Sequence, residues 1–280
     1  MLADVLPYLV CPHCGDDLEL SGTSLHCPNR HTFDVARQGY VSLLRAPTSF
    51  TGDTAAMIDA RSTFLGAGHY DPIVRELVAI EPGPGCVTDI GAGIGHYLAA
   101  VLDARPDRAG IAVDAAKPAL KRAARAHARL GAVLCDAWQD LPIKSGSTGL
   151  VLNVFAPRNP VELNRILHPQ GKLVVVAPTE RHLGELVSAV DMLTVAADKS
   201  DQVSARLAPY FTEEHRVLCE FPMALPHRDA AALVGMGPTA FHSEAEDIAA
   251  KVRALSEPVA VTGSVTVTTY LPVSTVESDR

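Results

Sequence analysis

The stretch TDIGAGIGHY, residues 88–97, carries glycine at every second position, at Gly91, Gly93 and Gly95. Because glycine has no side chain, such a loop lets a bulky ligand lie directly against the backbone. The stretch departs from the dinucleotide pattern GxGxxG, since His96 stands where the third glycine should allow helix and strand to pack closely. No lysine followed by serine or threonine comes after it, which excludes a phosphate-binding P-loop. Asp89, two residues before the loop, is placed to face a cationic amino group.

Carboxylates also stand at the ends of the next two strand-like runs. GIAVD ends at Asp114, 23 residues beyond Gly91, where a carboxylate can accept hydrogen bonds from both hydroxyls of a ribose. AVLCD ends at Asp136, beside Ala137, where a carboxylate can accept a hydrogen bond from the exocyclic amine of adenine. A ligand that joins an amino acid to an adenosine explains all three acids together. The loop therefore predicts a binding site for S-adenosylmethionine, with an NAD-type domain as the alternative.

The order of the elements agrees with a site at strand ends. From residue 87 on, strand-like runs such as VTDI, GIAVD and GLVLNVF alternate with helical patterns such as HYLAAVLD, KPALKRAARAHARL and PVELNRIL. This alternation predicts an α/β fold with a parallel sheet, helices on both faces and ligands beyond the carboxyl ends of the strands. HRVLCEFPMAL and VAVTGSVTVTTYLPV add two final strands, antiparallel where they pair, with HRDAAALVGMG and EAEDIAAKVRAL as helices between them. We expect a Rossmann-like, seven-stranded class I methyltransferase domain over residues 76–280, ending in a frayed tail, VSTVESDR.

Four potential metal ligands lie near the N-terminus. Cys11, Cys14, Cys27 and His31 form a CxxC pair followed, after twelve residues, by a CxxxH pair. Three thiolates and one neutral imidazole complete a tetrahedron around Zn²⁺, which leaves no open position for catalysis. The run LELS, the turn SGTS and the run LHC predict a hairpin that brings the two pairs together. We expect a structural zinc ion in a small zinc-ribbon-like domain over residues 1–45; four unrelated groups are the alternative.

The segment HTFDVARQGYVSLLR begins at the last metal ligand. Its Arg37 and Arg45 could meet phosphates, and Phe33 and Tyr40 could stack on bases, which would make this an RNA-recognition domain. The alternative, which composition favours, is that the aromatic and apolar residues form the core of the domain. Residues 46–75 begin with proline, threonine, serine and glycine and become helical from Thr54. They predict a linker and a connecting helix between the two domains.

The composition limits location and partners. The 280 residues are 48% hydrophobic and 20% charged, which is typical of a folded globular protein. No stretch resembles a secretory signal or reaches the length of a membrane span, so we expect a cytoplasmic protein without a membrane partner. In a reducing compartment the six cysteines are thiols or metal ligands rather than disulfides. The net charge of −8 means that binding to nucleic acid needs a local basic face.

Five stretches together resemble one family. They are CPHCGDDL with CPNRHTFDVARQGYVSLL, then GDTAAMIDARSTFLGAGHYDPI, TDIGAGIGHY, LNVFAPRNPVELNRILHPQG and PTERHLGEL, which span about residues 8–190. The combination is similar to the 23S ribosomal RNA guanine-N1 methyltransferases, and within them to the branch associated with resistance to tylosin-type macrolides. The resemblance implies methyl transfer from S-adenosylmethionine to N1 of a guanine in a 23S rRNA hairpin near the peptide exit tunnel. It also implies a homodimer that forms a cleft for the hairpin.

The resemblance further implies roles for individual residues. It assigns the structural zinc to the four ligands near the N-terminus. It implies contacts to S-adenosylmethionine from Tyr70, His96, Tyr97, Leu98 and His182. One departure concerns LPIKSGSTGL, where many related sequences carry acids and this chain has Ser145 and Gly149. A role for acids in that segment is therefore not carried over.

The chemistry of guanine N1 narrows what the enzyme must do. The sulfonium of the cofactor already activates the methyl group, so holding the acceptor in line dominates the contribution of the protein. N1 carries a proton at neutral pH, and an acceptor for that proton is expected within hydrogen-bond reach. Asn153, after the fourth strand, could bond a base edge, and Phe155 could stack on an extruded guanine. In the alternative, this turn only shapes the pocket through Pro157 and Pro160.

Basic residues gather after Asp114. The predicted helix KPALKRAARAHARL contains no acid, and it could meet the phosphates of RNA together with arginines elsewhere in the chain. Besides Arg37 and Arg45, the expected contacts to RNA are Lys117, Lys121, Arg122, Arg125 and Arg158. A solvated helix face is the alternative.

Two other functions stay open at this point. The same methyl transfer could act on transfer RNA or on a small molecule, because a zinc module and a basic helix do not select ribosomal RNA by themselves. The chain could instead be a non-catalytic zinc-containing adaptor for RNA or protein, whose glycine loop binds no cofactor. Saturable binding of S-adenosylmethionine separates this adaptor from the enzymes.

Overall fold

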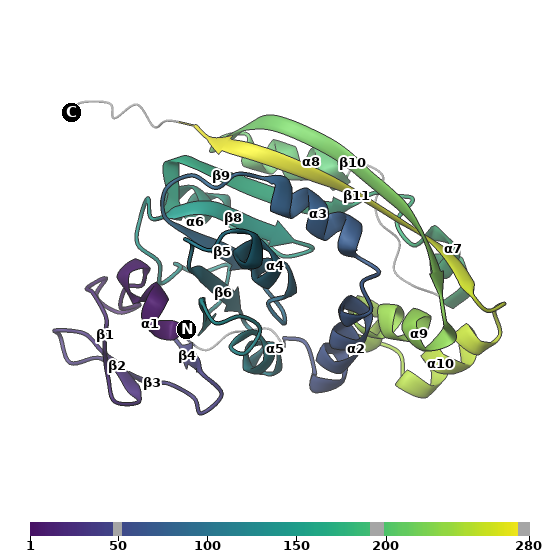
Figure 1. Cartoon of the computed structure of the whole chain (residues 1–280), viewed down its shortest axis with the longest axis horizontal. Helices are drawn as coiled ribbons and strands as arrows, with labels where there is room; N and C mark the ends of the chain where they lie inside the picture. The colour runs from purple at the N-terminus through teal and green to yellow at the C-terminus, as the bar shows by residue number, and fades with distance from the viewer. Residues whose placement is uncertain (47–51, 191–198, 274–280) are drawn as a thin grey trace.

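One mixed sheet of eight strands organises the molecule (Figure 1). The computed structural model describes residues 1–46, 52–190 and 199–273. Between residues 76 and 190, five strands run parallel: β5 (Cys86–Ile90), β6 (Gly110–Asp114), β7 (Leu130–Leu134), β8 (Thr148–Val154) and β9 (Leu167–Pro178). Their spatial order is β9-β8-β5-β6-β7, so the chain leaves β5 in one direction and later returns to its other side. The carboxyl ends of β5 and β8 therefore meet at a crevice between the connections.

Two long strands complete the predicted set of seven. β10 (Phe211–Leu225) and β11 (Val259–Pro272) pair antiparallel along their length, and β11 also pairs antiparallel with β9. In Figure 1 this two-stranded ribbon arches past the parallel strands to α9 (His227–Gly235) and α10 (Ala245–Arg253). The two antiparallel strands and the two helices between them are confirmed.

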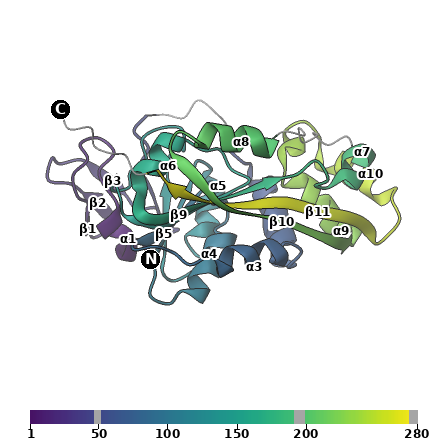
Figure 2. The same cartoon turned by 90° about the horizontal axis from the view of Figure 1, so that it is seen from above.

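Helices cover both faces of the sheet. Successive strand residues point to opposite sides, so each face carries apolar side chains that the helices bury. Ile111 and Val113 of β6 belong to one apolar cluster, and Ala112 between them belongs to the other. The first cluster includes residues of α1 (Leu2–Val5), α6 (Pro160–Ile166) and α8 (Lys199–Leu207). The second includes residues of α3 (Asp71–Ala79), α4 (His96–Ala104), α5 (Lys117–Ala123), α7 (Gly184–Val190), α9 and α10. Figure 2 shows α6 and α8 on one side of the sheet and α3 and α4 on the other.

The N-terminal segment is joined to the large sheet. After α1 and the short helix η1 (Leu6–Tyr8), the strands β1 (Glu19–Ser21), β2 (Ser24–His26) and β3 (Thr32–Asp34) form a small antiparallel sheet that contains the predicted hairpin. β4 (Tyr40–Ser42) then pairs parallel with β7 as the eighth strand of the large sheet. Leu9, Leu25 and Val41 share the apolar cluster of Ile111 and Val113. The expected division at residue 45 thus separates two parts with a common core.

The helix after β6 is shorter than its sequence pattern. The pattern KPALKRAARAHARL predicts a helix through Leu130, but α5 ends at Ala123. The chain then turns, and Arg129 donates hydrogen bonds to carbonyls at and just beyond the end of α4, those of Leu102, Arg105 and Arg108. These bonds hold the segment against α4 at the point where it enters β7. The prediction of helix beyond Ala123 is wrong for that reason.

The connecting helix begins where its sequence predicts. Thr54 accepts a hydrogen bond from the Met57 backbone N–H at 3.3 Å and so caps α2 (Ala55–Gly66). Residues 47–51, the expected start of the linker, and residues 274–280, most of the expected tail, lie outside the described residues. In the part of the chain that the structure describes, no helix is both long enough and apolar enough to cross a membrane.

Gly131 tests the contact between α1 and the sheet. A Cβ atom at this position would overlap Cγ2 of Val5, so Gly131→Ala should lower the free energy of unfolding by about 1–3 kcal/mol. The double variant with Val5→Ala should be more stable than Gly131→Ala alone, because the smaller side chain relieves the overlap. Urea unfolding measures both. Gly66→Ala is the matched control, since its Cβ meets open space; an equal loss there would contradict this packing.

Candidate active site

A cavity of about 810 Å³ lies at the carboxyl ends of the parallel strands. Its floor comes from the ends of β5, β6, β8 and β9 and from the residue that follows β7. Residues of α2, α4, α7, α9 and the short helix η2 (Pro238–Phe241) contribute to its walls. Strands that run parallel end at the same edge, which is why residues distant in sequence meet here. The cavity lies where the sequence predicts the cofactor site.

Two of the three loop glycines face this cavity. Gly91 has a φ of +74°, and a Cβ built on it would lie 2.5 Å from the Cβ of Ala156. Gly93 has a φ of +55° and lies against the Arg61 guanidinium. Gly95, with a φ of +78°, precedes α4 and packs against Ala123 instead. The first two glycines make room for Ala156 and Arg61 and line the cavity with backbone, and the third allows close packing against Ala123.

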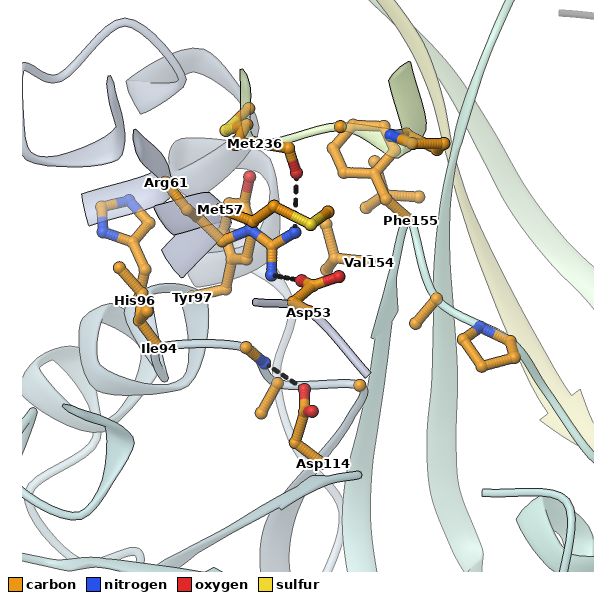
Figure 3. Close-up of a pocket in the computed structure, with 18 of the residues that line it drawn as sticks. Asp53, Met57, Arg61, Ile94, His96, Tyr97, Asp114, Val154, Phe155 and Met236 are labelled. Atoms are coloured by element: carbon orange, nitrogen blue, oxygen red, sulfur yellow. Dashed lines mark hydrogen bonds and ion pairs between the residues drawn. The ribbon is translucent and has the colours of Figure 1, made fainter. Parts of the chain in front are cut away.

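Asp114 holds the loop in place. Its Oδ2 accepts a hydrogen bond from the Gly93 backbone N–H at 2.8 Å (Figure 3). Its Oδ1 accepts one from the Ala116 N–H at 2.7 Å. Burial raises the pKa of this carboxyl. Each carboxylate oxygen can accept a second bond, so Asp114 still fits the two hydroxyls of a ribose.

Asp89 is a buried acid with an unused oxygen. Its side chain is 1% exposed, it lies in the cavity wall, and its Oδ2 has no hydrogen-bond partner among the described residues. Burial, together with the charge of Asp114, raises the pKa of Asp89 to about 8. A cationic group in the cavity would satisfy this oxygen and favour the ionised acid. The unpaired oxygen of Asp89 therefore fits the amino group of an amino-acid ligand.

Asp136 does not reach the cavity, although its neighbours do. Its Oδ1 accepts a hydrogen bond from the Trp138 backbone N–H at 2.9 Å, and its Oδ2 accepts one from Gln139 at 3.1 Å. Cys135 and Ala137 line the cavity instead. A direct bond from Asp136 to adenine stays a prediction.

Aromatic rings gather at the end of the cavity nearest β8. Tyr70 and His182 are buried and line the wall, with 3.2 Å between the tyrosine Oη and the histidine Nε2. The Ser264 backbone N–H donates to His182 Nδ1 at 3.1 Å, so Nε2 carries the hydrogen of the neutral ring. The ring of Phe155 lies 6.1 Å from that of Tyr70 and 5.7 Å from that of His182, and 42% of Phe155 is exposed.

The turn after β8 is held from below by Asn153. This residue is fully buried, and its Nδ2 donates to the Pro157 carbonyl at 2.9 Å. Its Oδ1 accepts a hydrogen bond from Arg158 Nε at 2.9 Å. Asn153 thus lies under the cavity wall, whereas Phe155, with a φ of +53°, lies in it. The geometry favours the alternative in which Asn153 shapes the turn rather than bonding a base.

The HYL turn divides between cavity and core. His96 and Tyr97 line the cavity, whereas Leu98 is fully buried in the core cluster of α4. The His96 Nε2 atom is buried and has no hydrogen-bond partner among the described residues. Burial lowers the pKa of His96, which favours the neutral ring. Its unpaired nitrogen is a second indication that the cavity is built for a polar ligand.

One wall of the cavity has no counterpart in the sequence predictions. Arg61 of α2 pairs with Asp53 at 2.5 Å and donates to the carbonyl of Met236, after α9, at 3.0 Å (Figure 3). Arg61 also lies against Gly93, so this group covers the glycine loop. A signal was present in GDTAAMIDAR, which carries both Asp53 and Arg61. The sequence carries no pattern that places Met236 and η2 at the cavity, because only the fold brings them to the glycine loop.

The four predicted metal ligands come together. Their ligand atoms all lie within 4.8 Å of one another. The Sγ atoms of Cys14 and Cys27 are 3.7 Å apart, and His31 Nδ1 lies 3.4 Å from Cys11 Sγ and 3.3 Å from Cys27 Sγ. Ligands at about 2.0–2.3 Å from Zn²⁺ in a tetrahedron have separations of this size. The donor set and its spacing fit a closed zinc site.

The predicted RNA contacts fall into two groups. Two of them are paired with acids, Arg45 with Asp140 and Arg122 with Asp59. Four others are exposed side chains: Arg37, Lys117, Lys121 and Arg125. Lys121, Arg122 and Arg125 border a second cleft of about 660 Å³, which Gln38 and the first half of α2 close from the other side. Arg158 lines the main cavity.

Comparison with known proteins decides the family. Residues 9–48 match the zinc-ribbon family model described as RlmA, N-terminal. A proposed 23S rRNA (guanine-N(1)-)-methyltransferase of Micromonospora griseorubida is 44% identical, over 98% of this chain and 100% of the relative. The 23S rRNA (guanine(748)-N(1))-methyltransferase of Streptomyces fradiae is 43% identical, over 97% of this chain and 99% of the relative. This chain belongs to the 23S rRNA (guanine-N1)-methyltransferase family.

Solved structures support the fold of this methyltransferase. A chain from the complex between the Haloferax volcanii Trm112 methyltransferase activator and a proposed methyltransferase superposes with a TM-score of 0.53, at 18% identity, over 80% of this chain and 99% of that one. The MccD protein superposes with a TM-score of 0.51, at 13% identity, over 74% and 99%. The predicted class I methyltransferase fold, its cofactor S-adenosylmethionine and the structural zinc are confirmed.

The zinc site of the methyltransferase can be tested by removing one ligand. Cys14→Ser should abolish the binding of one zinc ion per chain and lower the melting temperature, because metal binding contributes folding free energy in small zinc domains. Elemental analysis and calorimetry measure the two effects. His13→Gln is the control, since His13 is exposed and its ring lies 5.0 Å from that of His31 without belonging to the ligand set. Full zinc occupancy in Cys14→Ser would contradict the assignment.

The buried acid predicts a pH dependence of stability. In the unfolded chain Asp89 titrates near pH 4, whereas in the folded protein its pKa is about 8. Between these values the folded state binds the extra proton, so this group makes the ligand-free methyltransferase less stable as pH rises. Asp89→Asn lacks this titration. The melting temperature of Asp89→Asn minus that of the wild type should rise from pH 4 to pH 8 and be constant above pH 8. Parallel pH profiles would be evidence against the unpaired acid.

Proposed function

We propose that this methyltransferase binds S-adenosylmethionine in the cavity and methylates N1 of a guanine in a 23S rRNA hairpin near the peptide exit tunnel. The guanine would be the one that corresponds to position 748, which the name of the Streptomyces fradiae relative specifies. The observation that carries the proposal is the unpaired, buried oxygen of Asp89 beside bare glycine backbone. The identity of 43% over nearly the whole chain supports the substrate.

The cofactor would lie with its amino acid at β5 and its adenosine at β6 and β7. The amino group would satisfy Asp89, and the chain of the ligand would lie on the backbone of Gly91 and Gly93. The ribose would bond Asp114, whose oxygens can each accept one more hydrogen bond. The adenine would lie near Ala137, with Asp136 behind this wall rather than in it. Arg61 and its partner Asp53 would cover the ligand.

Tyr70 and His182 would contact the methionine end of the cofactor. His182 Nε2 donates to the Tyr70 oxygen, so the tyrosine keeps its own hydrogen for another acceptor. Burial raises the pKa of Tyr70, which keeps this hydrogen in place at neutral pH. His96 and Tyr97, which line the opposite part of the wall, would complete the contacts, while Leu98 would act through packing.

The protein would contribute position rather than activation. When bound, S-adenosylmethionine supplies a methyl group that its sulfonium already activates. Phe155 would stack on the extruded guanine, because its ring is exposed at the cavity wall and lies beside Tyr70 and His182. Asn153 would hold the turn that presents Phe155. Closure of the walls around the base would exclude water and fix N1 in line with the methyl group.

RNA phosphates would follow the basic residues around the cavity. Lys121, Arg122 and Arg125 border the cleft that Gln38 of the N-terminal segment closes, so a strand crossing here would touch both parts of the molecule. Lys117 and Arg37 are exposed and would add charge. Because backbone contacts position nucleic acid and base contacts specify it, these residues would set affinity and salt dependence. Residues 1–45 would then act as an RNA-recognition domain.

Three broader properties complete the proposal. Two copies of the chain would form a homodimer whose cleft holds the hairpin. The enzyme would act in the cytoplasm, where the ribosome is its substrate. Methylation near the exit tunnel would contribute to resistance against tylosin-type macrolides. All three rest on the resemblance to the tylosin-resistance branch of the family.

Asp114→Asn tests the cofactor site and the reaction together. One carboxylate oxygen becomes an amide NH2 group that cannot accept a bond from a ribose hydroxyl, so the affinity for S-adenosylmethionine should fall at least about tenfold. Calorimetry measures this loss. Asp107→Asn, at an exposed acid, is the control. The wild type should also cause a reverse-transcription stop at one guanine of 23S rRNA, because N1 methylation blocks base pairing.

The outcomes separate the alternatives. A wild type without saturable binding of S-adenosylmethionine would support the adaptor. Binding of the cofactor with a stop on transfer RNA, and none on 23S rRNA, would move the substrate to transfer RNA. A stop on 23S rRNA at a guanine other than the one that corresponds to 748 would keep the reaction and change its position.

A further inference from the structure

Arg158 lines the cavity, and part of its guanidinium has no hydrogen-bond partner among the described residues. Its Nε donates to Asn153 Oδ1 at 2.9 Å, and its Nη2 donates to the Ala156 carbonyl at 3.1 Å. Over residues 1–46, 52–190 and 199–273, no acid pairs with Arg158, and its Nη1 has no acceptor. The outer fork of the guanidinium, formed by Nη1 and the second N–H of Nη2, is therefore unsatisfied within the cavity wall.

The fork is rigid as well as unsatisfied. Asn153, which accepts the Nε hydrogen, is itself fully buried and bonded to the Pro157 carbonyl. The plane of the guanidinium is thus set by a network beneath the turn. Burial, together with the nearby charge of Arg206, lowers the pKa of Arg158, and no carboxylate among the described residues pairs with the cation. A group with two acceptors in one plane would satisfy the fork.

The position of Arg158 selects among such groups. It lies three residues after Phe155, on the same turn, and Ala156 between them packs against Gly91 of the cofactor loop. A guanine on Phe155 with N1 directed at the loop has O6 and N7 on one side of that axis. Arginine bonds this edge through two parallel hydrogen bonds. We propose that Arg158 recognises the target guanine through O6 and N7; the inference rests on the proposed function.

This contact would make Arg158 a specificity-determining residue. Adenine carries the N7 acceptor but presents an amino group where guanine has O6. The fork of Arg158 would then face a donor with a donor, and adenine would be rejected although it stacks equally well. The guanine 2-amino group lies on the other side of N1 and would not touch Arg158. Changes at O6 or N7 should therefore depend on Arg158, whereas changes at the 2-amino group should not.

A cycle of one protein change and one base change tests the contact. The full-length wild type and Arg158→Lys are assayed for kcat/KM on a 23S rRNA hairpin with guanosine or 7-deazaguanosine at the target. Lysine keeps the charge but loses the fork, and 7-deazaguanosine lacks N7. Each change alone should lower kcat/KM about tenfold. The two changes together should lower kcat/KM little more than either change alone. Inosine, which lacks only the 2-amino group, should show no such coupling to Arg158→Lys.

The control and the alternatives use the same assay. Arg253→Lys, at an exposed arginine of α10, should change neither substrate. Any general loss of folded protein cancels, because the comparison is between two RNAs within one variant. Equal ratios of the two substrates in the wild type and in Arg158→Lys would overturn the inference and indicate a phosphate contact. A loss of S-adenosylmethionine affinity in Arg158→Lys, measured by calorimetry, would indicate the cofactor carboxylate instead.

The experiment also distinguishes failure of the wider proposal. If the wild type binds S-adenosylmethionine but leaves the unmodified hairpin unmethylated, the proposed substrate is wrong, and the contact to guanine falls with it. If the wild type methylates the hairpin and the two changes act independently, only the role of Arg158 is wrong.

Discussion

A carboxylate buried without a partner costs folding free energy, on the order of 1–3 kcal/mol even for a neutral polar group, and Asp89 is such a group. It stands at the end of β5, where the chain must turn through Gly91 and Gly93 with bare backbone. Protonation relieves the cost in the ligand-free protein, as the pKa of about 8 indicates. A cationic ligand relieves it in a different way, because it lets the acid ionise. In the proposed site, Asp89 would therefore exchange stability of the ligand-free protein for affinity for the ligand.

The walls around Asp89 come from parts of the chain that only the fold unites. Arg61 on the connecting helix ties Asp53, the glycine loop and the end of α9 together. On the far edge of the sheet, β4 of the N-terminal segment pairs with β7, the strand that leads to Ala137 in the cavity wall. The zinc-binding segment is therefore attached to the same sheet as the cofactor site. RNA bound across the cleft at Gln38 would be positioned relative to that site by shared backbone hydrogen bonds.

The proposed binding side for the target base is organised by a single turn after β8. Asn153 holds this turn from below, Phe155 presents a ring from it, and Arg158 closes it with a fixed guanidinium. Burial separates the two roles: the amide of Asn153 is fully buried and can only support the turn, whereas the ring of Phe155 is exposed and can contact a ligand. Stacking by itself accepts any base, so discrimination has to come from hydrogen bonds to a base edge. Residues 155–158 of this turn can supply both the stacking surface, from Phe155, and the hydrogen-bond donors, from Arg158.

The sequence by itself determined the features that depend on spacing along the chain. The zinc ligands, the glycine loop and the strand-end acids Asp89 and Asp114 could be predicted, because short-range spacing and the alternation of strands and helices specify them. The tertiary structure alone decided that Asp136 lies behind the cavity wall, that α5 ends at Ala123 and that β4 joins the large sheet. It also decided the bond between Arg61 and Met236, which are 175 residues apart. Such contacts follow from how whole segments pack, and no local pattern records that packing.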